Sequence, residues 1–227
     1  AHLSVIRSLV LNGKAAKVVV DADSLETSLV ETAALDAGSS KEAFADSPYE
    51  KSLAALASGK TLSHLGPQAP RVAPEQFTLT IDMCQSRKPW EKRLFDWAVA
   101  LSDQVHAPIP VGIAMTGVWA KAHEAELAQI NAWQAQGKLA ITWVNHSSTH
   151  PLFCKNTSCS QATFLTEPSV DMDEEVFGLE RSLLARGMVP STLFRFPGLV
   201  HDQKRLGQLS RLGLMPLDAD AWIAKGE

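Results

Sequence analysis

The stretch that decides the fold is WVNHSSTHPLF, residues 143–153. Two histidines, His146 and His150, lie four residues apart directly after an apolar run. In a helical turn this spacing brings both imidazoles to one side, which suits a divalent metal ion. The same spacing also fits two polar loop histidines, so the residues elsewhere in the chain must decide between these interpretations.

Strand and helix patterns alternate on both sides of this stretch. Short β-rich runs predict strands at 77–83, 109–117, 138–146, 191–198 and 214–220. Longer amphipathic runs predict helices at 89–105, 119–137, 170–187 and 203–213. In the first helix, the apolar face predicted from the spacing is Leu94, Trp97, Leu101 and Val105. This alternation predicts an α/β fold with a parallel sheet, either open or closed into a barrel.

The first seventy or so residues have a different pattern. Residues 16–35 predict a short strand followed by a helix, and residues 47–60 predict a second helix capped by Ser47 or Asp46. Residues 64–76 contain three prolines and a glycine, which is a linker composition. We therefore predict a mostly helical segment with its linker at 1–72, and the main domain at 73–227.

Composition excludes some classes of function. The net charge is -4 and no Lys/Arg run occurs, so nothing indicates a nucleic-acid partner. No apolar run approaches the roughly 20 residues that span a membrane. The chain begins AHLSV without a signal sequence, which fits a processed or trimmed chain. Cys154 and Cys159 either close a short disulfide loop or are free thiols, and Cys84 is either a small buried side chain or a nucleophile.

Polar residues follow the predicted strands. At or just beyond the strand ends are Asp82 for the first strand, His146 and His150 for the third, Arg195, Pro197 and Gly198 for the fourth, and Asp218, Asp220 and Trp222 for the fifth. Carboxyl ends of parallel strands meet at one edge of the sheet, so we expect these side chains to converge there. Taken singly, each has an ordinary alternative: an acid that caps the next helix, or an arginine that pairs with a surface carboxylate.

The order of these pieces is more specific than any one of them. LTIDMC, VGIAMTGVW, NHSSTHPL, FRFPGL and LDADAW occur in that order between about Phe77 and Trp222. This order resembles the polysaccharide deacetylase-like superfamily, also called carbohydrate esterase family four. The resemblance implies a distorted (β/α) barrel, here with a small N-terminal appendage. It also implies removal of acetyl groups from a polysaccharide or peptidoglycan-type glycan, with bound zinc or another divalent metal such as cobalt or nickel.

The resemblance assigns roles to four residues at the centre of the site. In the family's first motif, T-F-D-D-G, the first Asp is the general base, and Asp82 matches it. His146 and His150 match the two histidine ligands of the metal. Arg195 matches the arginine that orients the base.

Further roles follow from the later motifs. Gly198 occupies the position where the family often has an aromatic residue whose backbone N–H stabilises the oxyanion, and the resemblance assigns the same task to the Gly198 N–H. Asp220, with Asp218 as the alternative, resembles the Asp that tunes the general-acid histidine. Trp222 resembles the tryptophan that lines the substrate pocket, and Trp143 is a second candidate for stacking on the sugar.

Two departures from the family pattern put activity in doubt. Met83 replaces the second Asp of the first motif, and a thioether is a poor substitute for that metal ligand. The late L-x-H motif, which supplies the general acid, does not occur, so we expect the chain to be incomplete at its C-terminal end. His201, in LVHD, either stands in for this histidine or is an ordinary loop or cap residue, which is the commoner role. A subset of similar sequences with an L-T-x-D-x-C run also lacks the second Asp.

These observations leave three interpretations of function. The first is a metal-dependent deacetylase, secreted or periplasmic, with a glycan substrate. The second is a catalytically impaired glycan-binding or scaffold protein on the same fold. The third, weaker, is a hydrolase of a non-sugar amide.

Overall fold

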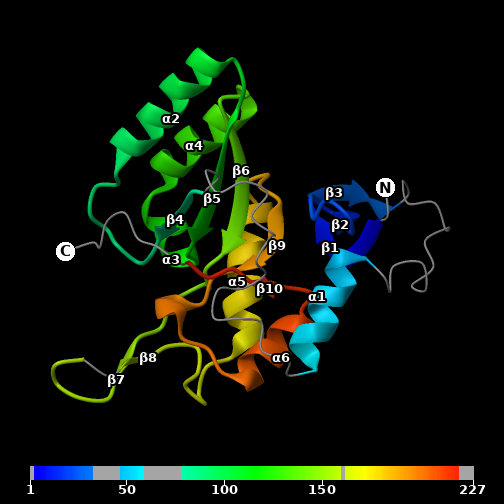
Figure 1. Ribbon diagram of the computed structural model, residues 1–227, viewed down its shortest axis with the longest axis vertical. Helices are drawn as coiled ribbons and strands as arrows, with labels where there is room; N and C mark the ends of the chain where they lie inside the picture. Colours follow the sequence, from blue (N-terminus) through cyan, green and yellow to red (C-terminus); the bar gives the residue numbers. More distant parts are fainter. Residues whose placement is uncertain (1–2, 33–46, 59–77, 160–161, 220–227) are drawn as a thin grey trace.

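The computed structural model describes residues 3–32, 47–58, 78–159 and 162–219 of the 227-residue chain. Its centre is a five-stranded parallel sheet flanked by helices (Figure 1). The strands are β4 (Thr80–Met83), β5 (Ile109–Met115), β6 (Leu139–Asn145), β9 (Pro190–Phe194) and β10 (Met215–Pro216). The α/β class and the parallel sheet are thus as the alternation of patterns predicts.

The strand order in this sheet is β10-β9-β6-β5-β4. It follows the chain order without a reversal, which is the winding of a barrel rather than of a doubly wound sheet. Within the described residues, β4 and β10 are the two edges and the sheet is open. Closure into a barrel therefore remains a prediction.

Helices connect the parallel strands. They are α2 (Lys92–Val105), α3 (Gly117–Ala122), α4 (Glu124–Ala135), α5 (Met172–Leu184) and α6 (Gln203–Arg211). The helix predicted at 119–137 is divided in two at His123, whose φ and ψ of -126° and 48° are not helical. The predicted apolar face of α2 is wrong at two of its four positions, since Trp97 and Val105 are 53% and 52% exposed, whereas Leu94 and Leu101 are half-buried. The buried residues of α2 are Phe95, Ala98 and Ser102.

The main hydrophobic core lies between the parallel sheet and the helices α2 and α4, which run along the same side of it (Figure 1). Ile113 from β5, Trp143 from β6, Phe95 from α2 and Ile130 from α4 are among its buried members. This core fixes the sheet, and with it the positions of the residues that follow the strand ends.

In its described part, residues 3–32 and 47–58, the N-terminal segment is mostly β-structure, where the sequence pattern predicts a mostly helical segment. Strands β1 (Leu3–Leu11), β2 (Lys14–Asp21) and β3 (Thr27–Glu31) form an antiparallel sheet, and α1 (Pro48–Ala57) follows. The helix predicted after the first strand within 16–35 does not form over Thr27–Glu31, because Leu29 and Val30 pair with β2 as a strand, and tertiary pairing overrides weak local propensity. The α1 prediction is confirmed, since Ser47 Oγ accepts a hydrogen bond from the Glu50 N–H.

This N-terminal sheet packs beside β9, away from α2 and α4 (Figure 1). Thr27 Oγ1 donates to the Pro190 carbonyl at 2.9 Å. Arg7 Nε lies 2.6 Å from the Glu180 carboxylate, and both side chains are largely buried. A second buried cluster joins Val20, Tyr49, Leu56, Phe194 and Leu209. The N-terminal elements thus share a core with the main domain, and the boundary that we predict near residue 72 lies outside the described residues.

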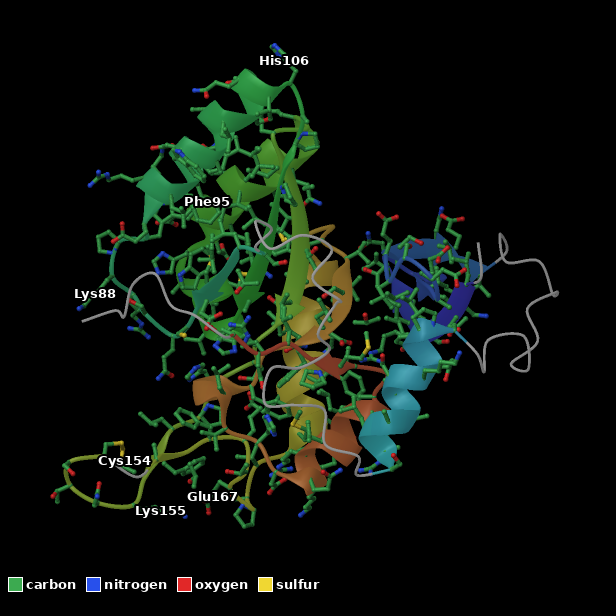
Figure 2. The ribbon with its side chains drawn as sticks, in the orientation of Figure 1. Lys88, Phe95, His106, Cys154, Lys155 and Glu167 are labelled. Carbon is green, nitrogen blue, oxygen red and sulfur yellow. A yellow bond between two sulfur atoms is a disulfide. The ribbon has the colours of Figure 1, made fainter. Side chains whose placement is uncertain are left out.

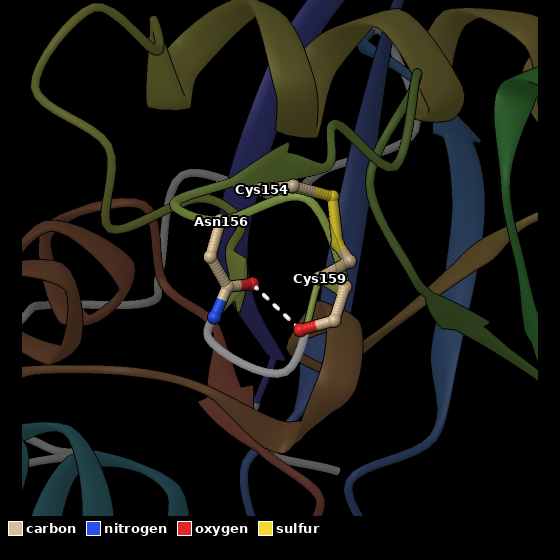
Figure 3. The surroundings of a disulfide bond; sticks show 4 residues. Cys154, Asn156 and Cys159 are labelled. Carbon is tan, nitrogen blue, oxygen red and sulfur yellow. Dashed lines mark hydrogen bonds between the residues drawn. A yellow bond between two sulfur atoms is a disulfide. The ribbon is translucent and has the colours of Figure 1, made fainter.

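A disulfide closes the short hairpin after the histidine stretch. Cys154 in β7 (Phe153–Cys154) is bonded to Cys159, with Cα atoms 4.7 Å apart, and β7 pairs with β8 (Ala162–Thr163). Figure 3 shows this loop, in which Ser158 Oγ donates to Asn156 Oδ1 at 3.3 Å. None of the helices in the described ranges has the length and apolarity needed to cross a membrane.

Candidate metal centre

Strand β4 directs alternate side chains to opposite sides. Thr80 and Asp82 both contact the guanidinium group of Arg195, whereas Met83 is 6% exposed and lies in the hydrophobic core. By the same period of two, Cys84 returns to the side of Asp82. Met83 therefore occupies no ligand position, and the side chain that reaches the histidines from this strand end is Cys84.

The two imidazoles are close together. Their ring centroids lie 4.9 Å apart, in an edge-to-face arrangement. Nδ1 of His146 is 2.7 Å from the Arg195 carbonyl oxygen, which can only accept a hydrogen bond, so this nitrogen carries the hydrogen. In the neutral imidazole the lone pair is then on Nε2, which faces Cys84 Sγ at 3.6 Å. The structure thus holds His146 in the tautomer that a metal ligand needs.

Cys84, His146 and His150 each offer one donor atom, and these atoms all lie within 4.8 Å of one another. The ligands of a tetrahedral zinc ion, bound at roughly 2.0–2.3 Å, lie roughly 3.3–3.8 Å apart, so closing the cluster needs shifts of roughly 1 Å. His150 supports the fit, because its Nδ1 is buried and has no hydrogen-bond partner in the described part of the chain. One sulfur and two imidazole nitrogens form a donor set that suits zinc or cobalt better than magnesium or calcium.

Burial keeps the imidazoles of this cluster neutral. Desolvation lowers the pKa of His146 from 6.5 to about 4, although its hydrogen bond to Arg195 and the nearby Asp82 carboxylate act in the opposite direction. Desolvation also lowers the pKa of His150. Burial raises the pKa of the Cys84 thiol to about 11, and the Asp82 charge adds to this effect. In the absence of a metal, therefore, Cys84 is a thiol and a poor nucleophile.

Arg195 organises the strand ends. Its side chain is 2% exposed, and its Nη1 donates to Asp82 Oδ1 at 2.9 Å. Nη2 donates to Thr80 Oγ1 at 3.1 Å, and Nε donates to the Leu217 carbonyl oxygen. The Asp82 side chain is 36% exposed, so one side of the carboxylate is fixed by Arg195 while the other can meet solvent.

The histidine stretch turns sharply between its two imidazoles. Ser147 and His150 both have positive φ values, 71° and 50°. Such conformations cost of the order of 1–3 kcal/mol for a non-glycine residue and persist only where surrounding contacts impose them. The turn is therefore held in place against its own backbone preference.

Gly198 follows β9 in the turn Pro197–Leu199, with a φ of 61°. A Cβ atom at this position would collide with the Phe164 ring. That ring also packs edge-on against His150, with centroids 5.7 Å apart. The absence of a side chain at Gly198 therefore lets Phe164 support the second histidine.

A histidine–carboxylate pair, His201 and Asp218, lies next to Arg195. His201 Nε2 is 3.6 Å from Asp218 Oδ2, and the Asp218 side chain is only 4% exposed. Asp218 Oδ1 is buried without a hydrogen-bond partner among the described residues. The Asp218 carbonyl oxygen accepts a hydrogen bond from Arg195 Nη2 at 3.4 Å, which links this pair to the guanidinium group that holds Asp82.

Trp143 cannot stack on a substrate, so that prediction is wrong. It is 3% exposed in the main core, and its Nε1 donates to Gln134 Oε1 at 3.3 Å. The apolar run of β6 buries it, which is the usual position of a strand tryptophan. Asp220 and Trp222 lie outside the described residues.

Comparison with known proteins shows similarity to solved structures over part of the chain. No protein-family model matches the chain. Two solved structures are similar to part of it. One is a family 4 carbohydrate esterase from Streptomyces lividans in complex with acetate, with 18% identity, a TM-score of 0.38, and coverage of 61% of this chain and 59% of that chain. The other is a mutant of a family 4 pseudoenzyme with restored enzymatic activity, with 15% identity, a TM-score of 0.38, and coverage of 61% and 42%.

This chain spans less than two thirds of the length of either neighbour. At this degree of similarity the likeness carries no argument about activity. The assignment of roles therefore depends on the side chains described above.

Proposed function

We propose that this protein is a metal-dependent hydrolase that removes acetyl groups from a polysaccharide or peptidoglycan-type glycan. The observation that carries the proposal is the cluster of Cys84, His146 and His150 donor atoms, close enough to the Asp82 carboxylate for its charge to act on all three. The order of these residues in the sequence, which resembles carbohydrate esterase family four, points to the same chemistry.

Each side chain has a chemical task in this proposal. A zinc, cobalt or nickel ion held by the three donors would polarise the acyl carbonyl and lower the pKa of a water from 15.7 towards about 7. Asp82 accepts a proton from the attacking water, and Arg195 fixes the orientation of this base. Gly198 is an exposed residue in the turn after β9, and we assign its N–H the task of donating to the negative charge that develops on the carbonyl oxygen.

Hydrolysis of an amide also needs a proton for the leaving amine. His201 is the described residue to which we assign this task, because its Nε2 lies 3.6 Å from the buried carboxylate of Asp218, which can orient the imidazole. Asp220 and Trp222 remain candidates for tuning this acid and for lining the substrate pocket.

We also propose that the protein acts outside the cytoplasm, either secreted or in a periplasm. The support for this is the Cys154–Cys159 disulfide, since disulfides persist mainly in oxidising compartments.

The test is metal analysis of the purified full chain, followed by acetate release from chitooligosaccharides, peptidoglycan fragments and acetylated xylan. We expect about one zinc per chain and release that stops on chelation and returns with zinc, cobalt or nickel. Absence of bound metal, together with no release when these ions are supplied, would overturn the proposal. Glycan binding that survives both chelation and H146A would instead indicate a scaffold protein, and release only from non-sugar amides would indicate the third interpretation.

A further inference from the structure

Glu175 is a buried carboxylate on α5, 9% exposed, that faces the histidine stretch. Its Oε2 accepts from the Thr149 backbone N–H at 2.8 Å, and its Oε1 accepts from Thr149 Oγ1–H at 2.6 Å. No arginine or lysine pairs with Glu175 in the part of the chain that the structure describes. A carboxylate is costly to bury without a cation. The burial of Glu175 against Thr149 therefore points to a specific role for this side chain.

Thr149 directly precedes His150, whose φ is 50°. The His150 N–H donates to Ser147 Oγ at 3.0 Å, which closes the turn from within. On the other side of the turn, the Ser147 N–H donates to Asn145 Oδ1 at 2.9 Å, and Asn145 Nδ2 donates to the Val176 carbonyl at 3.0 Å. Glu175 and Val176 are neighbours on α5, so one turn of this helix holds both ends of the stretch.

The approach of α5 and α3 to this stretch is also very close. A Cβ atom at Gly178 would lie 2.5 Å from Ser148 Oγ, and one at Gly117 would lie 2.8 Å from the Ser148 carbonyl oxygen. The Gly117 and Val118 N–H groups donate to the Ser147 and Ser148 carbonyls at 3.2 and 3.0 Å. The stretch therefore lies between two helices that leave it little freedom to relax.

We propose that Glu175 is a positioning residue for the metal centre. Through Thr149 it holds His150 in its left-handed conformation, so that the second imidazole meets His146 and Cys84 before any ion arrives. This inference rests on the metal-binding part of the proposed function. A strained residue persists only when the surrounding structure imposes its conformation. We infer that α5, through Glu175, imposes the left-handed conformation of His150.

The test is the zinc and cobalt affinity of the full chain, measured by competition with a chromophoric chelator. Removal of a residue that orients a metal ligand typically weakens metal binding by about 10–100-fold, and we expect a loss of this size in E175A. E175Q should keep most of the affinity, since its amide can accept from the Thr149 N–H and donate to Oγ1. T149V removes one of the two contacts and should show a smaller loss than E175A.

The matched control is E180A. Glu180 is on the same helix and 3% exposed, but its carboxylate pairs with Arg7, away from the metal centre. We expect E180A to lower stability and leave metal affinity unchanged. Wild-type affinity in E175A, or an equal loss in E180A, would overturn the inference. If E175A fails to fold, the metal affinity of T149V is the test. A reduced affinity in T149V supports the positioning role of Glu175, and wild-type affinity overturns it. Failure of the unsubstituted chain to bind any ion would overturn the proposed function itself.

Discussion

Cys84 Sγ lies 3.6 Å from Nε2 of His146, although the two residues are 62 positions apart in the sequence. Parallel pairing of β4 with β5 and of β5 with β6 brings them together, since each residue follows the end of its strand. The hydrogen bond from His146 Nδ1 to the Arg195 carbonyl turns the lone pair of Nε2 towards the thiol. This relationship gives the candidate centre a sulfur donor.

Replacement of Asp82 should separate catalysis from metal binding. In D82N, Arg195 keeps an acceptor but the base is lost, so acetate release should fall by about 10²–10⁴-fold. Metal content should stay as in the wild type, because the three proposed ligands are intact. The control is D96N, which alters an exposed aspartate that pairs with Lys92 on α2. Loss of the metal in D82N would show that Asp82 is a ligand rather than the base.

The metal-free protein should lose stability as the pH falls from about 6.5 to about 4. His146 has a pKa of about 4 when folded and an ordinary value of 6.5 when unfolded. Between these values the unfolded state binds more protons, so the free energy of unfolding decreases with falling pH. The lowered pKa of His150 acts in the same direction.

Urea unfolding at pH 7 and pH 5, in the presence of a chelator, checks this dependence. We expect a smaller difference between the two pH values in H146N than in the wild type. H106N is the control, since His106 is exposed at the far end of α2 (Figure 2) and has a left-handed conformation that asparagine tolerates. An unchanged pH dependence in H146N would contradict the account of a neutral buried imidazole.

Substitution G198A should be costly for two reasons. Alanine at a φ of 61° costs about 1–2 kcal/mol, and its Cβ would collide with the Phe164 ring. We therefore expect a loss of stability above this range, and weaker metal binding because Phe164 can no longer support His150. The double substitution F164A/G198A removes the collision, so chemical denaturation should show favourable coupling between the two sites. Strictly additive losses would argue against the contact.

The sequence predicts which residues converge, because strand order and strand ends can be read from alternating patterns. Asp82 lies near the end of β4, and His146 and Arg195 directly follow β6 and β9. In the sheet β5 separates β4 from β6, and the parallel pairing of the four strands brings these residues to one edge. The same alternation could have identified Cys84, since a step of two from Asp82 returns to the same side of β4. The family's first motif instead has its metal-ligand Asp at the position of Met83, whose side chain the strand turns into the core.

Other features were not accessible from local pattern. Leu29 and Val30 form a strand because β2 is available for pairing, a fact that no window of sequence contains. The face of α2 depends on how the helix meets the sheet, and Phe95 rather than Trp97 lies against it. The role of Glu175 likewise depends on contact with Thr149, 26 positions away.

Removal of His201 should matter only when the leaving group needs a proton. In H201Q, we expect hydrolysis of an N-acetylated glycan to fall by about 10²–10⁴-fold. Hydrolysis of an aryl acetate, whose leaving group departs without protonation, should change little, and metal content should be unchanged. In D218N we also expect a larger loss of activity on the N-acetylated glycan than on the aryl acetate, but a smaller loss than in H201Q. Equal losses on both substrates would assign His201 a structural role.

The most direct test of the central claim is X-ray absorption spectroscopy at the zinc edge on the zinc-loaded full chain, with C84S as its partner. Cys154 and Cys159 are bonded to each other, so any cysteine thiolate ligand must be Cys84. We predict one sulfur scatterer at about 2.3 Å and imidazole nitrogens at about 2.0–2.1 Å, with the sulfur absent in C84S. A first shell of nitrogen and oxygen alone in the wild type, or failure to retain zinc at all, would contradict the account.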